Sequence, residues 1–230
     1  MTSGTLYVVA TPIGNLKDMT FRAVEVLKEA DLIAAEDTRH TRILTEHYGI
    51  KAPLTSYFEH NRITKGDFLI KQLKEGKKVA LVSDAGTPGI SDPGAHIIAL
   101  AIKEGINVIG IPGPAAVILG LILSGMPTDR FIFEGFLPNK SGSRRNKLAE
   151  FKDEKRTVVF YESPHRILRT LYDILDVFGD IRICVMRELT KKFEEILRDN
   201  VSKIAANFER SKPKGEFMVV FNPKRGGNGS

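Results

Sequence analysis

Cysteine is nearly absent from this chain of 230 residues, which contains only Cys184. A single cysteine cannot form a disulfide within the chain, and it excludes a zinc site of the Cys-x-x-Cys type. Cys184 lies in the apolar segment 181–186. We therefore expect it to be a small hydrophobic residue buried in the core.

Long apolar runs are also missing. The longest, 115–123, is too short to cross a bilayer and is interrupted by Gly120. Residues 1–4 have neither the basic region nor the apolar core of a secretory signal peptide, and a strand is expected directly after them. These features predict a cytoplasmic protein with no membrane partner.

Several familiar site motifs do not occur. There is no Gly-x-x-x-x-Gly-Lys-Ser/Thr segment, which argues against a P-loop NTPase. Residues 11–16 read Thr-Pro-Ile-Gly-Asn-Leu instead of Gly-x-Gly-x-x-Gly, which disfavours a Rossmann dinucleotide site and the similarly built methyltransferase fold. The histidines lack metal-ligand spacing, so we expect no metal. No Gly-x-Ser-x-Gly segment is present, which argues against the nucleophile elbow of an α/β-hydrolase.

Positive charge is in excess, with 34 Lys and Arg residues against 28 Asp and Glu residues and a formal net charge of +6. A basic balance is compatible with a nucleic-acid partner. The basic residues crowd the segment 140–156. A solvated helix face is the alternative explanation of that segment.

Strands and helices alternate over residues 6–123, which predicts an α/β domain with a parallel sheet at residues 1–123. The first helix is expected to be capped by Asp18 or Thr20. The expected strands are 6–10, 32–35, 79–82 and 107–111, with an extended piece at 53–56. One expected helix ends at residue 48. Three others are expected to span 64–74, 93–104 and 115–123.

The pattern changes after residues 124–129, which form the best linker candidate. Both short and long connections follow, which predicts a mixed sheet in a C-terminal α/β domain, residues 124–225. Residues 226–230 are expected to be a disordered tail. The expected strands are 130–135, 157–161, 181–186, 193–197 and 216–221, and the expected helices are 143–152, 165–178 and 202–208.

The loop after the strand 79–82 is rich in small and polar residues. Gly86 and Gly89 let the backbone approach a ligand, and Asp84 offers a carboxylate. Asp92 is a candidate N-cap, with Pro93 as the first helical residue. Open α/β sheets bind ligands at such loops. A tight strand-to-helix turn without a ligand is the alternative.

Four loops should meet at the carboxyl edge of the parallel sheet, because each follows one of its strands. They are residues 11–16, 36–39, 84–92 and 112–115. Their Gly, Pro, Ser, Thr and Asp residues suit a polar, adenine-bearing cofactor held through backbone groups.

Seven blocks, taken together and in order, resemble the tetrapyrrole methylase superfamily. They are 6–16 (LYVVATPIGNL), 35–39 (AEDTR), 83–94 (SDAGTPGISDPG), 112–116 (PGPAA), 131–138 (FIFEGFLP), 161–166 (YESPHR) and 187–191 (RELTK). The resemblance implies a tetrapyrrole-methylase-like fold of two α/β domains, with S-adenosylmethionine in the cleft between them. It also implies a homodimer.

Within this superfamily the blocks are closest to a bacterial branch that methylates 16S ribosomal RNA. The resemblance therefore implies a 2′-O-methyltransferase acting on a cytidine ribose in the decoding centre. Porphyrin-methylating members carry Gly-x-Gly-x-Gly-Asp and Gly-Gly-Asp-Pro where this chain has Thr-Pro-Ile-Gly-Asn-Leu and Val-Ser-Asp-Ala. The alternatives are a small-molecule methylase of the same fold and a non-enzymatic RNA-binding module.

The expected cofactor contacts are Asp84 and the small residues around it, together with positions that match the family. They are Pro12, Ser83, Asp84, Ala85, Gly86, Thr87, Pro112, Ala115, Ala116, Tyr161, Met186 and Leu189. For Tyr161 and Met186, a place in the core is the alternative.

The candidate general bases for a ribose hydroxyl follow two strands. Glu36 and Asp37 follow the strand 32–35, and Glu162 and His165 follow the strand 157–161. Three of the four have a structural alternative: Asp37 can cap the next helix, Glu162 can pair with Arg166, and His165 can be a polar helix-start residue.

RNA binding is expected to rest on phosphate contacts from basic side chains and on aromatic rings that stack on bases. The candidate phosphate contacts are Arg39, Arg62, Arg144, Arg145, Lys147 and Arg166. The candidate stacking residues are Tyr57, Phe58 and Phe136.

Overall fold

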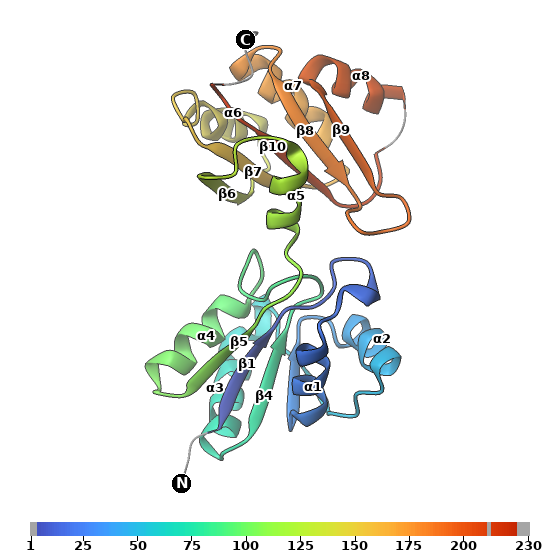
Figure 1. Cartoon of the computed structure of the whole chain (residues 1–230). Helices are drawn as coiled ribbons and strands as arrows, with labels where there is room; N and C mark the ends of the chain where they lie inside the picture. The colour runs from blue at the N-terminus through green and yellow to red at the C-terminus, as the bar shows by residue number, and fades with distance from the viewer. Residues whose placement is uncertain (1–3, 211–212, 225–230) are drawn as a thin grey trace. The chain divides into compact units, whose positions relative to one another are not determined.

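The computed structural model describes residues 4–210 and 213–224, and it divides into two compact units between Ala115 and Ala116 (Figure 1). The N-terminal unit contains a five-stranded sheet in the order β3-β2-β4-β1-β5. All of its strand pairs are parallel, which confirms the predicted sheet. The strands are β1 (Thr5–Val9), β2 (Leu32–Ala35), β3 (Leu54–Ser56), β4 (Lys78–Val82) and β5 (Asn107–Ile111).

Helices cover both faces of this sheet, and strand β4 shows why. Val79 and Leu81 pack into a core with α3 and α4, whereas Ala80 and Val82 pack into a second core with α1 and α2. An unbroken apolar strand is therefore buried on both sides. The helices are α1 (Phe21–Glu29), α2 (Thr38–Tyr48), α3 (Arg62–Lys74) and α4 (Gly94–Lys103), with single 3-10 turns at Leu16–Asp18 and Glu59–Asn61.

Helix ends in this unit follow local capping chemistry. Thr20, rather than Asp18, caps α1, because its hydroxyl accepts a hydrogen bond from the amide of Ala23 at 3.2 Å. Asp37 caps α2 by accepting from the amide of Arg39 at 2.8 Å. Gly49 ends α2 in the left-handed region, at φ 62°.

The C-terminal unit contains a second five-stranded sheet, in the order β6-β7-β10-β8-β9. Strands β6 and β7 are parallel and the other pairs are antiparallel, so the predicted mixed sheet is confirmed. The strands are β6 (Phe131–Phe136), β7 (Thr157–Glu162), β8 (Arg182–Arg187), β9 (Glu195–Asn200) and β10 (Phe217–Phe221). The helices are α5 (Ala116–Ser124), α6 (Ser141–Ala149), α7 (Ile167–Phe178) and α8 (Val201–Arg210).

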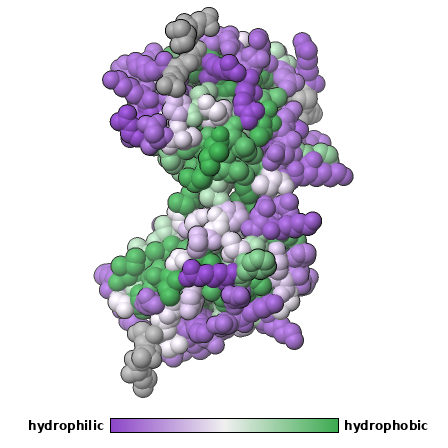
Figure 2. Space-filling model, viewed as in Figure 1, coloured by the Kyte–Doolittle hydropathy of each residue, from purple (hydrophilic) through white to green (hydrophobic). Residues whose placement is uncertain are grey.

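The two faces of the second sheet are covered differently. Helices α6, α7 and α8 pack over one face in a single core that includes Phe160 and Val219. Helix α5 contacts β7 and β10, and a Cβ added at its Gly120 would lie 1.5 Å from Cε of Met218 and 3.1 Å from Sδ of Met186. Hydrophobic surface gathers around α5 (Figure 2), where Ile118 and Ile122 are exposed.

Some boundaries differ from the sequence-based expectation; the helix expected at 143–152, for example, spans Ser141–Ala149. The strand expected at 193–197 begins at Glu195, because residues 188–194 form a turn in which the amide of Thr190 donates to the carboxylate of Glu194. Helix α5 groups with the C-terminal unit, whereas the sequence placed the domain boundary after residue 123. The predicted division into domains at residues 123 and 124 stays a prediction. The expected tail at 226–230 lies outside the described residues.

Cys184 is buried in β8, and burial raises the pKa of its thiol to about 11. This agrees with the expected core position and leaves the thiol protonated and unreactive at neutral pH. Within residues 4–210 and 213–224, no helix is long and apolar enough to cross a membrane.

Replacing Gly120 by Val is expected to destabilise the protein by about 1–3 kcal/mol, because the added atoms would overlap Met218 and Met186 where α5 meets the sheet. Urea unfolding measures the change. Gly142→Val in α6 is the matched control, since a Cβ there meets nothing within 4 Å. Equal stability of the two variants would show that α5 does not need this close approach.

Candidate active site

The loops that follow β1, β4 and β5 are joined by backbone and hydroxyl hydrogen bonds. Thr11 and Gly86 exchange amide-to-carbonyl hydrogen bonds of 2.9 and 3.0 Å. The Thr11 hydroxyl also donates to the carbonyl oxygen of Ser83 at 3.2 Å, and the Thr87 hydroxyl donates to that of Pro114 at 3.2 Å. Thr11 thus has a structural role that no sequence motif signalled.

Asp84 ties the loop after β2 to the same edge. Its Oδ1 accepts a hydrogen bond from the amide of Asp37 at 2.9 Å, and its own amide donates to Oε2 of Glu36 at 3.4 Å. All four loops expected to meet at the carboxyl edge of the sheet therefore do so.

Asp92 shapes the second half of the central loop. Its Oδ1 accepts hydrogen bonds from the amides of Gly89, at 2.7 Å, and Gly94, at 2.8 Å. Gly89 and Gly86 have φ values of 90° and 80°, which favour glycine. Helix α4 begins at Gly94 with Pro93 at the N-cap position, so Asp92 lies one residue before the cap that it was expected to form, and Pro93 precedes the helix instead of opening it. The Asp92 carboxylate still accepts from the amide of the first helical residue, Gly94.

The pKa values of the carboxyl groups at this edge are shifted in opposite directions. Burial raises the pKa of Glu36, and the charges of Asp84, Asp92 and Asp37 raise it further against an opposing hydrogen bond from the Asp84 amide. Burial also raises the pKa of Asp92. Hydrogen bonds from Arg39 lower the pKa of Asp37 to about 2. Carboxyl groups with divergent pKa values in one place are typical of functional sites.

The expected cofactor residues of the N-terminal unit fall into two groups. Pro12, Ser83 and Gly86 are buried, and Ser83 and Gly86 form hydrogen bonds that join the loops, whereas Asp84 and Ala85 are exposed at the edge. Thr87 and Ala115 are half-buried and Pro112 is exposed. These expected contacts are therefore small residues, loop backbone and the carboxylate of Asp84, a set that fits a polar ligand held through backbone groups.

Two expected cofactor residues of the C-terminal unit, Tyr161 and Met186, lie in one row across its sheet, on either side of Met218, which was not expected. Tyr161, Met218 and Met186 are direct neighbours on β7, β10 and β8. Burial raises the pKa of Tyr161, and its ring packs edge-on against that of Phe133. Met186 is 1% exposed, which agrees with the core alternative. Leu189 lies in the β8–β9 turn and Ala116 opens α5.

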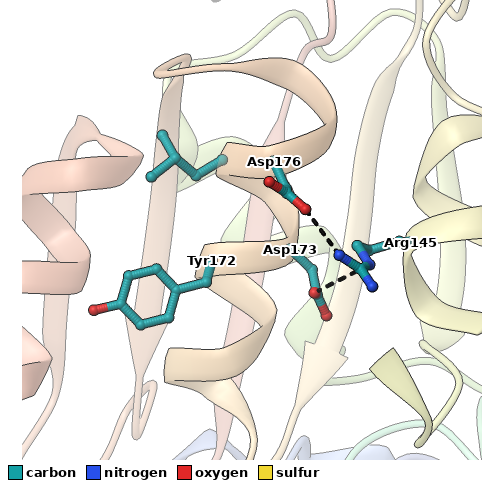
Figure 3. Close-up of a pocket in the computed structure, with 5 residues that line it drawn as sticks. Arg145, Tyr172, Asp173 and Asp176 are labelled. Atoms are coloured by element: carbon teal, nitrogen blue, oxygen red, sulfur yellow. Dashed lines mark hydrogen bonds and ion pairs between the residues drawn. The ribbon is translucent and has the colours of Figure 1, made fainter. Parts of the chain in front are cut away.

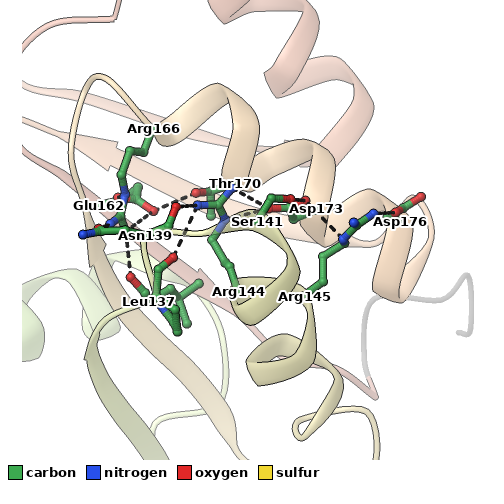
Figure 4. Close-up of polar contacts among 11 residues, drawn as sticks. Leu137, Asn139, Ser141, Arg144, Arg145, Glu162, Arg166, Thr170, Asp173 and Asp176 are labelled. Carbon is green, nitrogen blue, oxygen red and sulfur yellow. Dashed lines mark hydrogen bonds and ion pairs between the residues drawn. The ribbon is translucent and has the colours of Figure 1, made fainter.

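Glu162 is committed to a hydrogen-bond network (Figure 4). Its Oε1 accepts from the amide of Ser163 and from Nε of Arg166, both at 2.8 Å. Its Oε2 accepts from Nη2 of Arg166 at 3.0 Å and from the hydroxyl of Thr170 at 2.7 Å. The pairing alternative for Glu162 is therefore correct, and Arg166, a candidate RNA contact, is held in the same network. His165 is exposed at the start of this segment.

Arg144 does not lie on a solvated surface, contrary to the expectation for the basic helix. It is only 2% exposed, and its Nε donates to Oδ2 of Asp173 at 2.6 Å (Figure 4). Its Nη1 donates to the carbonyl oxygen of Asn139 at 3.1 Å. The apolar i, i+4 neighbour Leu148 is also buried, so this side of α6 faces the core. Sequence spacing alone did not reveal the buried partner.

Arg145 is instead half exposed and lines an open pocket of about 340 Å³ beside α7 (Figure 3). Its Nη1 lies 2.9 Å from Oδ2 of Asp176, and its Nε lies 3.9 Å from Oδ1 of Asp173. Both neighbours are carboxylates, so the charge of Arg145 is already partly compensated.

The other candidate RNA contacts are engaged to different degrees. Arg39 is 89% exposed while it pairs with Asp37, and Arg62 pairs with Glu59. Lys147 lies between Glu134 and Glu150. Among the candidate stacking rings, Phe58 and Phe136 are exposed, but Tyr57 is 1% exposed and packs in the core, where its hydroxyl contacts His96.

Among residues 4–210 and 213–224, no group of three or more His, Cys, Asp and Glu side chains is placed to hold a metal ion.

The sequence profile of a family described as tetrapyrrole (corrin/porphyrin) methylases matches residues 5–205. The chain belongs to this tetrapyrrole methylase family. A relative from Halalkalibacterium halodurans, named ribosomal RNA small subunit methyltransferase I, is 53% identical over 217 residues, or 94% of this chain and 75% of that protein. A Thermotoga maritima protein of the same name is 49% identical over 221 residues, or 96% of this chain and 99% of that protein.

Solved structures of this family confirm the fold. Diphthine synthase aligns with a TM-score of 0.74 at 16% identity, over 95% of this chain and 90% of that one. A cobalt precorrin-4 methyltransferase aligns with a TM-score of 0.70 at 17% identity, over 94% of each chain. The predicted family is thus correct, and so is its fold of two α/β units, one with a parallel sheet and one with a mixed sheet.

Replacing Asp173 by Ala is expected to lower the free energy of unfolding by about 3–5 kcal/mol, because it leaves the buried Arg144 guanidinium without its carboxylate. The matched control is Asp176→Ala, whose exposed pair with Arg145 should contribute at most about 1 kcal/mol. Chemical denaturation compares the two. A similarly small loss of unfolding free energy in both variants would mean that the Arg144 side chain is solvated.

Replacing Glu36 by Gln is expected to stabilise the protein at pH 7. Because burial raises the pKa of Glu36 above 4.5, its carboxylate is less stable in the folded than in the unfolded state. Below that pH both states are protonated, so the advantage of the variant should appear as the pH rises through the raised pKa.

Urea unfolding at pH 4 and pH 7 measures this difference. Glu25→Gln, on the exposed side of α1, controls for the loss of one negative charge. A Glu36→Gln protein less stable than wild type at pH 7 would contradict the proposed cost of burial.

Proposed function

We propose that the protein is an S-adenosylmethionine-dependent methyltransferase of 16S ribosomal RNA, and that it modifies the ribose 2′-oxygen of a cytidine in the decoding centre. The observation that carries the proposal is the name shared by relatives that are between 49% and 53% identical over at least 94% of this chain. The methylated atom and the nucleotide rest on the family resemblance. A homodimer in the cytoplasm is part of the same proposal.

The joined loops of the N-terminal unit support a cofactor site. The Thr11–Gly86 pairing and the Asp92 contacts fix the loop backbone, so its amides and carbonyls are positioned before a ligand arrives. When bound, S-adenosylmethionine supplies a methyl group on a positively charged sulfur. The residues proposed to hold it are Pro12, Ser83, Asp84, Ala85, Gly86, Thr87, Pro112 and Ala115, with Ala116, Tyr161, Met186 and Leu189 from the second unit.

Among the candidate bases, the contacts favour Glu36. Its Oε2 accepts a long hydrogen bond of 3.4 Å, and its raised pKa makes it a stronger base than an ordinary glutamate. Asp37 is weakened as a base by Arg39, and the four hydrogen bonds to Glu162 occupy its lone pairs. His165 remains a candidate because it is exposed.

For RNA phosphates, exposure favours Arg39 first, with Arg62, Arg145 and Lys147 as further candidates. Each of these cations already has a carboxylate neighbour, so each must exchange that partner for a phosphate. Phe58 and Phe136 are the candidates for stacking on a base that is turned out of its helix.

The test is the transfer of a labelled methyl group from S-adenosylmethionine to small ribosomal subunits from cells that lack this activity. Nuclease digestion and mass spectrometry then locate the label. A 2′-O-methylcytidine in the decoding region is the expected product. A label on a base would overturn the assigned atom. Tight cofactor binding without transfer to RNA would instead favour a small-molecule methylase or a non-enzymatic module.

In the same assay, Glu36→Gln is expected to lower kcat by about 10²–10⁴-fold, because the amide cannot accept the proton of the 2′-hydroxyl. Calorimetry should show cofactor affinity close to that of wild type. Glu25→Gln, which removes a charge from α1, should retain activity. An unchanged kcat for Glu36→Gln would move the assignment to another candidate base.

A further inference from the structure

The turn between β8 and β9 presents an aromatic ring beside a lysine. Phe193 is 67% exposed, and Nζ of Lys192 lies 5.6 Å from the centre of its ring. Covering such a ring removes apolar surface from water, so an exposed ring beside a cation is a favourable place for a partner to bind. Neither residue is among the RNA contacts expected from the sequence.

A network of hydrogen bonds holds this turn in one conformation. The carboxylate of Glu188 accepts from the amide of Glu216 at 3.0 Å and from Nζ of Lys191 at 2.9 Å. The carboxylate of Glu194 accepts from the amide of Thr190 at 2.6 Å. The ring of Phe193 is therefore carried on a fixed support, which reduces the entropy lost when it contacts a partner.

The backbone of the turn is strained in the middle of this network. Glu188 and Thr190 have φ values of 53° and 67°, in the left-handed region that few non-glycine residues adopt. Such conformations are unfavourable and persist where surrounding contacts enforce them, often at binding sites. Gly215 makes room for this arrangement, since a Cβ there would lie 2.5 Å from Cγ of Glu188.

Most charged side chains of the turn have a partner of opposite charge or a hydrogen bond, but Lys192 has no carboxylate partner among the described residues. Lys191 is shared between Glu188 and Glu216, Glu194 is bound to a backbone amide, and Glu195 pairs with Arg187. Lys192, in contrast, has no carboxylate within salt-bridge distance among the residues that the structure describes. One cation next to one exposed ring is thus left for a partner.

We propose that this turn binds a single-stranded stretch of the RNA substrate, with Phe193 stacking on a base and Lys192 contacting an adjacent phosphate. Stacking on an aromatic ring and pairing of a lysine with a phosphate are two interactions by which proteins commonly hold unpaired nucleotides. This inference rests on the proposed RNA substrate, and it assigns a contact surface that is separate from the residues proposed for catalysis.

The experiment measures the KM for small ribosomal subunits, and the affinity for a single-stranded RNA oligonucleotide, with Phe193→Ala, Phe193→Leu and Phe193→Trp. Loss of one stacked base should weaken RNA binding by roughly five- to 150-fold. The Leu variant keeps an apolar side chain without a flat face, so it should behave like Ala, whereas Trp should restore binding. Calorimetric affinity for S-adenosylmethionine should stay unchanged in all three.

Lys192→Ala should reduce the dependence of RNA affinity on salt by about one phosphate contact, a change of about 0.7 in the slope for single strands. Phe21→Ala is the matched control, since Phe21 is 92% exposed on α1 in the other unit and should leave RNA affinity unchanged.

Wild-type RNA affinity in Phe193→Ala, or an equal loss in Phe21→Ala, would overturn the proposal while leaving the proposed function intact. Rescue by Leu as well as by Trp would also overturn it, because it would indicate apolar packing in place of stacking. Absence of methyl transfer to RNA by the wild-type protein is the separate outcome that removes the proposed function and this inference with it.

Discussion

The paired backbone contact between Thr11 and Gly86 is the constraint on which the N-terminal site depends. It joins the loop after β1 to the loop after β4, two strands that are also neighbours in the sheet. Asp84, two residues before Gly86, then reaches the loop after β2, and Thr87, one residue after it, reaches the loop after β5. A single fixed point thus determines where four loops can lie. The left-handed backbone of Gly86 makes this crossing possible, because a side chain would be strained at φ 80°.

Charged residues have two roles in this chain, which differ in how deeply the side chains are buried and how fully their charges are paired. In the C-terminal unit, Arg144 and Glu162 are almost fully enclosed, and each has a partner of opposite charge with further hydrogen bonds. Such pairs fix the packing of α6, α7 and β7, because any rearrangement would leave a buried charge without a partner. At the sheet edge of the N-terminal unit, carboxylates of the same sign lie close together and are incompletely compensated. That arrangement opposes stability and is typical of sites that bind or react.

The sequence was informative where local chemistry decides the structure. Apolar runs located the strands of the parallel sheet, and the residue classes at Thr20, Asp37 and Gly49 located helix ends, because capping depends on neighbours in the chain. The meeting of loops at one sheet edge also followed, since parallel strands share a direction. Contacts between distant residues were not accessible in this way. Arg144 looked like part of a basic surface because its partner Asp173 lies 29 positions away, and Tyr57 looked like a stacking residue because nothing local shows its burial. The hydroxyl of Thr11 was missed for the same reason.

The position of Pro112 to Ala115 has a consequence for the chain as a whole. These residues form the loop after β5, and the division between the two units follows directly after them. Pro114 is held to the central loop by the hydroxyl of Thr87, and Arg198 of β9 binds the carbonyl oxygen of Leu123 at the far end of α5, with Nε at 3.0 Å. The peptide that connects the units is therefore short and anchored on each side by a long-range hydrogen bond. Two separately synthesised halves, divided at this point, would each lose a covalent restraint. One half would lose it on the loop after β5, and the other on α5, which contacts β7 and β10 of the second sheet.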